Sequence, residues 1–362
     1  MMELNRSIYS HVWNHNRSEV AVSVNNRVEV FKHDGDEWDL LDVLDKHDLR
    51  VTGVDWSPIS NRIVSCAADR NAYVWTQDGD GKWKHTQVHL RINHGATCVK
   101  WSPHGNKFAV GSGSKIISVC YSNEISDWWE AMHIKKSIRS TVTSVDWHPN
   151  NILLACGSTD YKARIFCAYI KDIEETPEST AWGDKIQFGQ LVAQFVYETD
   201  CGGWVHNVSF SPDGNKLCWV SHDSTVNLAE ATKGNVAVKF KTKYLPFLSC
   251  KWISNVCMAV AGHDCKLVFY EVNDDGKLVE KECSLNLNIP KLNDEKSLSA
   301  MKKFQMWDKQ GTEDVQIGRL DSEHQKAVTT ICVHSKKESG VSKISSSGLD
   351  GRLIIWNLNC PK

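Results

Sequence analysis

The sequence lacks any long run of apolar residues. Its longest such run lies at residues 256–261, whereas a helix needs about 20 apolar residues to cross a bilayer. The N-terminal segment also lacks the apolar core of a secretory signal. We therefore expect a protein that has no membrane insertion and stays in the cytoplasm.

An excess of either charge is also missing. In 362 residues, 42 Lys and Arg stand against 44 Asp and Glu, which leaves a formal net charge of −2. Proteins that bind nucleic acids or anionic membranes through charge carry a positive excess, so the composition does not indicate either class.

Motifs for metals and cofactors are scarce as well. The 13 cysteines form no Cys-x-x-Cys pair, so neither a zinc site nor a disulfide framework is indicated. Residues 111–113 read Gly-Ser-Gly, but the Gly-Lys-Ser/Thr sequence of a phosphate-binding loop does not follow them. We expect reduced, mostly buried thiols, no metal and no cofactor.

Tryptophan is abundant by contrast, with 15 residues against 10 Phe. The tripeptide Trp-Ser-Pro at residues 56–58 returns in recognisable form at residues 101–103, 147–149 and 210–212. A second series, Trp38, Trp83 and Trp128, has a spacing of 45 residues. Two series with one period show that a whole unit repeats, and the period is that of a four-stranded propeller blade.

One copy of the unit shows how the strands arise. Residues 52–56 alternate apolar and polar side chains, and residues 57–61 supply turn chemistry. Residues 62–67 have no extended polar face, which suits a strand packed between neighbouring blades. The more polar residues 82–88 fit an outer strand at the rim.

Seven such units are present, which predicts an all-β, seven-bladed propeller formed by residues 1–362 as a single domain. Two segments stretch the spacing: we expect residues 171–188 between blades four and five, and residues 286–322 between the last two blades. We expect residues 1–9 to close the ring as the outer strand of the last blade, because an open sheet edge favours aggregation. The seven third strands, with their preceding turns, lie at residues 26–31, 69–75, 114–120, 160–166, 223–229, 264–269 and 350–356.

A Ser, a His and an Asp in one unit resemble a hydrolase triad superficially. The same set recurs, however, whereas an active site is normally unique, so we interpret these residues as buried hydrogen-bond chains of WD repeats that hold turns in place. The dipeptides His222-Asp223 and His263-Asp264 occupy the corresponding turn in later blades, and we give them the same structural interpretation. The two chains are His47, Ser65, Asp69 and Trp75, and then His324, Ser346, Asp350 and Trp356.

Two segments are candidates for contact with a partner. The basic residues Lys135, Lys136 and Arg139 could touch an acidic surface, although a solvated loop is the alternative interpretation. Residues 299–309 predict a short amphipathic helix, with Ser299 as a possible N-cap. A helix of that length is marginal alone, so its apolar side must pack on a partner or on the propeller itself. Its candidate contact residues are Leu298, Met301, Phe304 and Trp307.

These residues resemble one family closely: the WD-repeat subunit, subunit 1, of the actin-related protein 2/3 complex. The resemblance covers essentially the whole chain. Residues 182–189 look like a loop of that family, and residues 298–309 look like its protruding helix, with Phe304 at the position of the family's Phe. The most specific strings lie at residues 60–66, 69–75, 107–113, 127–129, 133–151 and 203–206.

The resemblance implies a non-catalytic scaffold in a hetero-oligomer of seven subunits at the actin cytoskeleton. Its expected partners are the other subunits, the actin filament and nucleation-promoting factors, with nucleic acid not among them. Two alternatives remain at this point. One is an enzymatic propeller, which would gather reactive side chains at the central channel. The other is a different interaction propeller, such as a ubiquitin-ligase substrate receptor or a chromatin adaptor.

Overall fold

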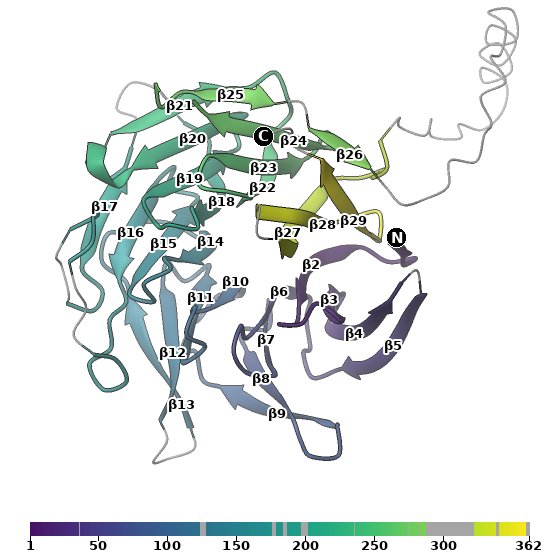
Figure 1. The fold of residues 1–362 in the computed structure, drawn as a ribbon. Helices are drawn as coiled ribbons and strands as arrows, with labels where there is room; N and C mark the ends of the chain where they lie inside the picture. Colours follow the sequence, from purple (N-terminus) through teal and green to yellow (C-terminus); the bar gives the residue numbers. More distant parts are fainter. Residues whose placement is uncertain are drawn as a thin grey trace, which may run out of the picture.

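The computed structural model describes residues 1–35, 37–123, 128–175, 179–183, 187–196, 202–234, 236–273, 275–281, 283–286, 322–337 and 340–359. Seven antiparallel sheets surround a central axis, which confirms the seven-bladed β-propeller (Figure 1). The helix expected at residues 299–309 lies outside the described residues, together with Leu298, Met301, Phe304 and Trp307.

The first four blades follow the chain from the inner to the outer strand. Blade one contains β2 (Ile8–Trp13), β3 (Glu19–Val24), β4 (Arg27–Asp34) and β5 (Glu37–Leu44), and blade two contains β6 (Val51–Trp56), β7 (Arg62–Ala67), β8 (Ala72–Gln77) and β9 (Trp83–Val88). Blade three contains β10 (Ala96–Trp101), β11 (Lys107–Ser112), β12 (Ile117–Asn123) and β13 (Trp128–Ile134), and blade four contains β14 (Val142–Trp147), β15 (Leu153–Ser158), β16 (Ala163–Cys167) and β17 (Leu191–Phe195).

The remaining blades keep the same order until the ring closes. Blade five contains β18 (Val205–Phe210), β19 (Lys216–Ser221), β20 (Thr225–Glu230) and β21 (Ala237–Lys241), with a 3-10 turn, η1 (Ala231–Lys233), before its outer strand. Blade six contains β22 (Phe247–Trp252), β23 (Cys257–Gly262), β24 (Leu267–Val272) and β25 (Leu278–Lys281), and blade seven contains β27 (Val328–Lys337), β28 (Gly340–Gly348), β29 (Arg352–Asn359), β1 (Met2–Glu3) and β26 (Ser284–Asn286).

Burial of the strands follows the sequence pattern. Every residue of β11 and β15 is buried, because both faces of these second strands pack against neighbouring blades. The outer strand β9 is exposed at most positions, as its polar sequence predicts. Apolar clusters cross from one blade to the next, so the hydrophobic core is a series of layers between blades.

Neighbouring blades are also joined by a repeated hydrogen bond. The second residue of four inner strands is a Thr whose hydroxyl donates to a carbonyl at the start of the next inner strand. These bonds join blades two to three, three to four, four to five and seven to one: Thr52 to Ala96 (2.9 Å), Thr97 to Val142 (2.6 Å), Thr143 to Val205 (2.6 Å) and Thr329 to Ile8 (3.0 Å).

The turns after four of the inner strands share one left-handed residue. Gly105, Asn151 and Gly214 have φ angles of 63°, 68° and 77°, and each backbone N–H donates to the carbonyl three residues earlier. Glycine and asparagine adopt this conformation at low cost. In blade one the equivalent residue is Arg17, with a φ of 64°.

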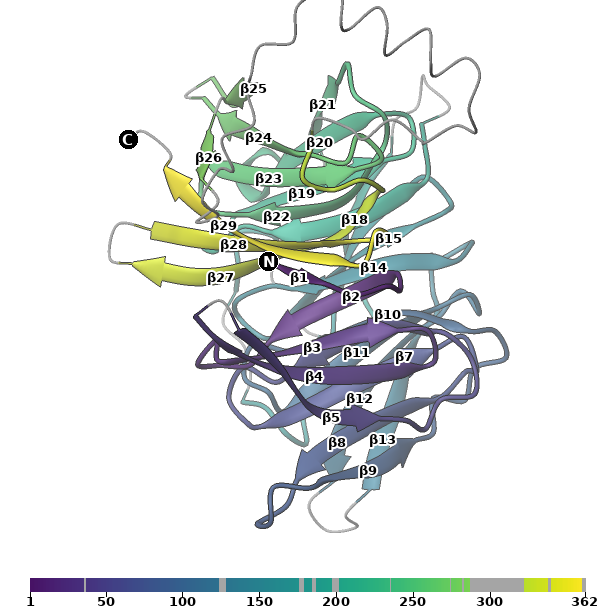
Figure 2. The ribbon, with the colours of Figure 1, turned by 90° about the vertical axis from the view of Figure 1, so that its right-hand side faces the viewer.

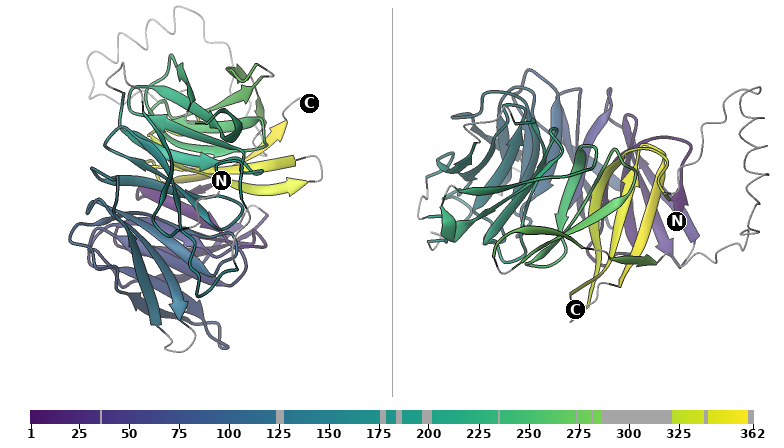
Figure 3. Two further views of the ribbon diagram at one scale, coloured as in Figure 1. Left: turned by 90° about the vertical axis from the view of Figure 1, so that its left-hand side faces the viewer. Right: turned by 90° about the horizontal axis from the view of Figure 1, so that it is seen from above.

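The outer edge of blade seven is completed by two segments that are distant in sequence. Strand β1 pairs with β29 at Leu353 and Arg352, and β26 pairs with its other end at residues 357–359. The N-terminus therefore lies beside β29, where the first and last blades meet (Figure 1). Strands β27 and β28, with 10 and 9 residues, are longer than the inner strands of the other blades (Figures 2 and 3).

The placement of residues 171–188 differs from the sequence-based expectation. Strand β17 pairs with β16 and is the outer strand of blade four. The segment therefore lies inside blade four rather than between blades four and five. Residues 191–195 carry none of the turn or tryptophan signals of the repeat, so this strand was not predicted.

Candidate functional site

The residues of the first predicted chain lie together at the end of the propeller where the blade-to-blade loops meet the second turns. Trp75 Nε1 donates to Ser65 Oγ (2.9 Å), and His47 Nε2 lies 2.9 Å from the same hydroxyl. His47 Nδ1 lies 2.9 Å from Asp69 Oδ2. Since the Asp69 carboxylate can only accept, one neutral tautomer satisfies the chain: Nδ1–H donates to Asp69, and Nε2 accepts from the Ser65 hydroxyl, whose oxygen accepts from the indole.

Burial and hydrogen bonding both act on His47. Burial lowers the pKa of His47, and its hydrogen bond to Asp69 opposes that change. The carboxylate of Asp69 also accepts the backbone N–H groups of Asp48 (3.0 Å) and Asn71 (2.9 Å). The chain thus joins a loop, a turn and two strands within blade two.

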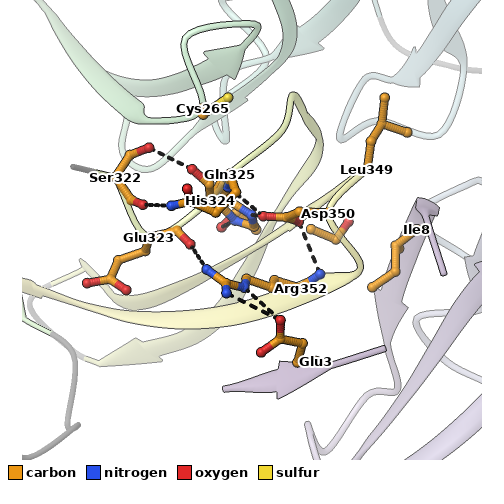
Figure 4. A network of polar contacts seen from close by, with 12 residues as sticks. Glu3, Ile8, Cys265, Ser322, Glu323, His324, Gln325, Leu349, Asp350 and Arg352 are labelled. Carbon is orange, nitrogen blue, oxygen red and sulfur yellow. Dashed lines mark hydrogen bonds and ion pairs between the residues drawn. The ribbon is translucent and has the colours of Figure 1, made fainter. Parts of the chain in front are cut away.

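Blade seven repeats this arrangement, and its His324 and Asp350 lie close to the N-terminal segment (Figure 4). Trp356 Nε1 donates to Ser346 (2.7 Å), which lies 2.8 Å from His324 Nε2, and His324 Nδ1 lies 3.1 Å from Asp350. Although burial raises the pKa of Asp350, hydrogen bonds from His324 and from backbone N–H groups hold it below its usual value. Ser65 and Ser346 are fully buried, so a substrate cannot reach either hydroxyl in this structure.

Blade four fills the same positions in a different way, which the sequence analysis missed. Ile138 stands where the other chains have His, and Phe166 stands where they have Trp. Arg164, which is fully buried, instead makes two bonds to Asp160 (2.9 and 2.7 Å) and one to Gln194 (3.0 Å). An arginine in the third strand, four residues after the turn Asp, was the available signal.

The basic candidates lie on the loop that enters blade four. Lys135, Lys136 and Arg139 are exposed, and the backbone N–H of Arg139 donates to Asp160 (3.0 Å). The loop is therefore anchored by its backbone, which leaves the three cationic side chains at the surface.

A buried ion pair, also missed by the sequence analysis, holds the start of the segment after β16. Lys107 in β11 is fully buried, and its ammonium lies 2.5 Å from Glu174 and 2.7 Å from the Ala168 carbonyl. Glu174 also accepts from Asn151 Nδ2 and from the Ile170 backbone N–H. Burial lowers the pKa of Lys107, and Glu174 opposes that change. The pair ties blade three to the loop of blade four.

The charged residues that directly precede the repeated aromatic residues in the sequence line the central channel. Lys100 pairs with Asp55 at 3.1 Å, and Lys251 pairs with Asp146 at 3.7 Å. The second oxygen of each carboxylate accepts the backbone N–H of the next blade, from Trp101 (2.7 Å) for Asp55 and from Phe210 (2.8 Å) for Asp146. Alternating Asp-Trp and Lys-Trp pairs in the repeats were the sequence signal for this arrangement.

The histidines near the turn of blade five form a compact pair. His206 Nε2 lies 3.0 Å from His222 Nδ1, and the Trp204 ring lies 4.5 Å from the His222 ring. Burial, His222 and His263 lower the pKa of His206 to about 4. Within the part of the chain that the structure describes, no group of three or more His, Cys, Asp or Glu residues could hold a metal ion, and no helix is long and apolar enough to cross a membrane.

The fold and the repeated chains define a WD-repeat propeller. The family described as WD domain, G-beta repeat matches residues 38–76, 85–120 and 133–167. The chain is 48% identical to actin-related protein 2/3 complex subunit 1A-A of Xenopus laevis over 97% of this chain and 94% of that protein. Identity to subunit 1 of Schizosaccharomyces pombe is 37% (97% and 96%), and identity to subunit 1B of Arabidopsis thaliana is 35% (97% and 94%). The chain belongs to the family of subunit 1 of the actin-related protein 2/3 complex.

Proposed function

We propose that this chain is a non-catalytic scaffold subunit of an actin-related protein 2/3 complex and works in the cytoplasm at the actin cytoskeleton. The observation that carries this proposal is identity of 35–48% over 97% of the chain to proteins named as subunit 1 of that complex. Coverage of this extent includes every blade, so the similarity extends over the whole propeller. The other subunits of the complex are the expected partners.

The chemistry of the described residues supports a scaffold. The serine, histidine and aspartate side chains that look reactive in the sequence are used in hydrogen bonds that hold loops and turns. The relatives named above are complex subunits, so a ubiquitin-ligase receptor or a chromatin adaptor is not favoured.

Contacts with the actin filament and with nucleation-promoting factors form the finer part of the proposal. We assign them to the basic side chains of Lys135, Lys136 and Arg139, which are exposed, and to Phe304 and Trp307. The last two rest on sequence alone, because they lie outside the described residues. Interface aromatics often contribute about 2 kcal/mol or more to binding.

Affinity purification of the tagged chain with mass spectrometry tests the scaffold role, and recovery of the other complex subunits is the expected result. Recovery of ubiquitin-ligase subunits in their place would refute the proposal. Reconstitution with Phe304→Ala and Trp307→Ala together then tests the finer part. We expect normal assembly and melting temperature with lower actin branch density, whereas normal branching with a lowered melting temperature would show that these residues pack on the propeller itself.

A further inference from the structure

The central channel contains a cavity of about 380 Å³ at the end formed by the turns after the inner strands. Its walls include the ion pairs Asp55–Lys100 and Asp146–Lys251. The Lys100 and Lys251 side chains remain 37% and 34% exposed, so both ammonium groups are accessible from the cavity. A cavity of this size is within the range of small-ligand sites.

Arg17 also lines this cavity and carries the unbalanced charge. Its side chain is half-buried, and burial lowers the pKa of its guanidinium. Within the described part of the chain, no carboxylate or other acceptor contacts the guanidinium. Three cations against two carboxylates leave the cavity with a net charge of +1. A partly desolvated cation without a partner is unfavourable unless an anion accompanies it.

The charged groups lie close enough to act on one thiol. Burial raises the pKa of the Cys332 thiol, and so does Asp55. The cationic side chains of Lys100, Lys251 and Arg17 lower it. Cys332 itself lines the cavity. The three cationic residues and this thiol thus line one cavity.

The backbone at Arg17 gives a second, independent argument. Blades three, four and five place Gly105, Asn151 and Gly214 at the equivalent left-handed position, whereas blade one places an arginine there with a φ of 64°. Arginine is less favourable than glycine or asparagine in this conformation. Of these four equivalent positions, only that of blade one keeps a cationic side chain in spite of the backbone cost.

We propose that the channel cavity binds an oxyanion of the phosphate class, held by Arg17 together with Lys100 and Lys251. The guanidinium fork donates two parallel hydrogen bonds to such a group, and the two ammonium groups add point charges. Asp55 and Asp146, fixed by backbone N–H groups of the next blades, keep both lysines at the cavity wall. The phosphate group can belong to free inorganic phosphate or to a phosphorylated side chain.

Titration calorimetry of the purified full chain with inorganic phosphate, at constant ionic strength, tests the proposal. Arg17→Asn introduces the residue that blade four already has at this position, so the variant should fold with an unchanged or higher melting temperature. We expect its phosphate affinity to be at least tenfold weaker, with part of the affinity kept by Arg17→Lys. Arg70→Asn is the matched control, because Arg70 is also left-handed (φ 71°) but is exposed and does not line the cavity.

The results divide clearly. Phosphate binding that is lost in Arg17→Asn and kept in Arg70→Asn supports the proposal. No phosphate binding by the unmodified chain, or equal affinity in Arg17→Asn, overturns it. A phosphoserine peptide that binds more tightly than inorganic phosphate identifies a phosphorylated side chain as the source of the phosphate group, and weaker binding identifies free phosphate. A control peptide of the same length, with Glu in place of phosphoserine, should bind more weakly than the phosphoserine peptide. Equal binding of the two peptides overturns the proposal that the cavity prefers a phosphate group.

Discussion

His11 joins the first blade to the last through its two ring nitrogens, and protonation of its imidazole opposes this contact. Its Nδ1 and Nε2 atoms each lie 2.8 Å from a serine hydroxyl of β28, at Ser347 and Ser345. Burial, Lys100, His324 and His334 lower the pKa of His11 to about 3. The folded protein therefore holds this imidazole neutral.

This pKa makes stability depend on pH in a defined direction. An unfolded chain takes up the proton near the ordinary pKa of 6.5, whereas the folded chain does so only near 3, so stability falls as the pH drops below 6.5. For one such group the loss at pH 5 is about 2 kcal/mol. We expect His11→Gln to lower the stability at pH 7 but to make the difference between pH 7 and pH 5 smaller by about that amount in urea unfolding.

His15 provides the control for this prediction, because it is exposed in the neighbouring turn. His15→Gln should keep the pH dependence of the unmodified protein. An unchanged pH dependence in His11→Gln would mean that other groups dominate the acid response.

At the residue scale, the sequence predicts the hydrogen-bonded residues that recur in several repeats. It does not predict a residue such as Arg164, which takes their place in one blade only. His47 and Asp69 were found because the same residue types return as His324 and Asp350 in another copy of the repeat. Arg164 was not found, since a single buried arginine has no repeat to reveal it, and its pairing with Asp160 depends on the distance between two strands. For the ion pairs of the channel, the alternating Asp-Trp and Lys-Trp pairs mark the charged positions, but which charges meet depends on contacts between blades.

At the scale of elements, the pair formed by Lys107 and Glu174 fixes the segment that follows β16. Removing one partner leaves a buried charge uncompensated, which typically costs about 3 to 5 kcal/mol. We expect Glu174→Gln to destabilise the protein by about 3 kcal/mol in urea unfolding. Adding Lys107→Met should recover most of this loss, because the buried charge is then removed as well.

The neighbouring Glu175 gives a matched control, since it is exposed. Glu175→Gln should change the free energy of unfolding by no more than about 0.5 kcal/mol. A double variant no more stable than Glu174→Gln alone would show that the uncompensated ammonium is not the cause of the loss.

The prediction of elements from sequence succeeded where turn and tryptophan signals marked the strands. It failed at β17, whose five residues, Leu191–Phe195, follow a long segment and carry neither signal. The predicted length of the N-terminal strand that closes the ring was also too great. Residues 1–9 were expected to form one outer strand, but β1 contains only Met2 and Glu3, and Ile8 already belongs to the inner strand β2.

At the scale of the whole molecule, the ring closes through a position that requires glycine. Gly351 has a φ of 79°, and its carbonyl accepts the Leu4 N–H (2.8 Å). An added Cβ would overlap the Leu4 carbonyl oxygen and lie 2.7 Å from that of Arg6. On the other side of the contact, Arg352 pairs with Glu3 at 3.2 Å (Figure 4).

We expect Gly351→Ala to detach the N-terminal segment, to lower stability by about 2 kcal/mol or more, and to expose residues 1–6 to proteolysis. Gly79→Ala is the control, since an added Cβ there meets nothing within 4 Å. Deleting residues 1–6 should destabilise the unmodified protein but add little in the Gly351→Ala background. Fully additive losses would show that glycine at 351 serves another purpose.

The split outer edge of β29 also sets the order in which the molecule can be completed. Met2 is made long before its partner Leu353. At a synthesis rate of about 5 to 20 residues per second, Met2 waits about 20 to 70 seconds for that partner. During this time the first six blades can form but the seventh cannot, so the nascent chain carries an open ring with a free strand edge until β29 has been made.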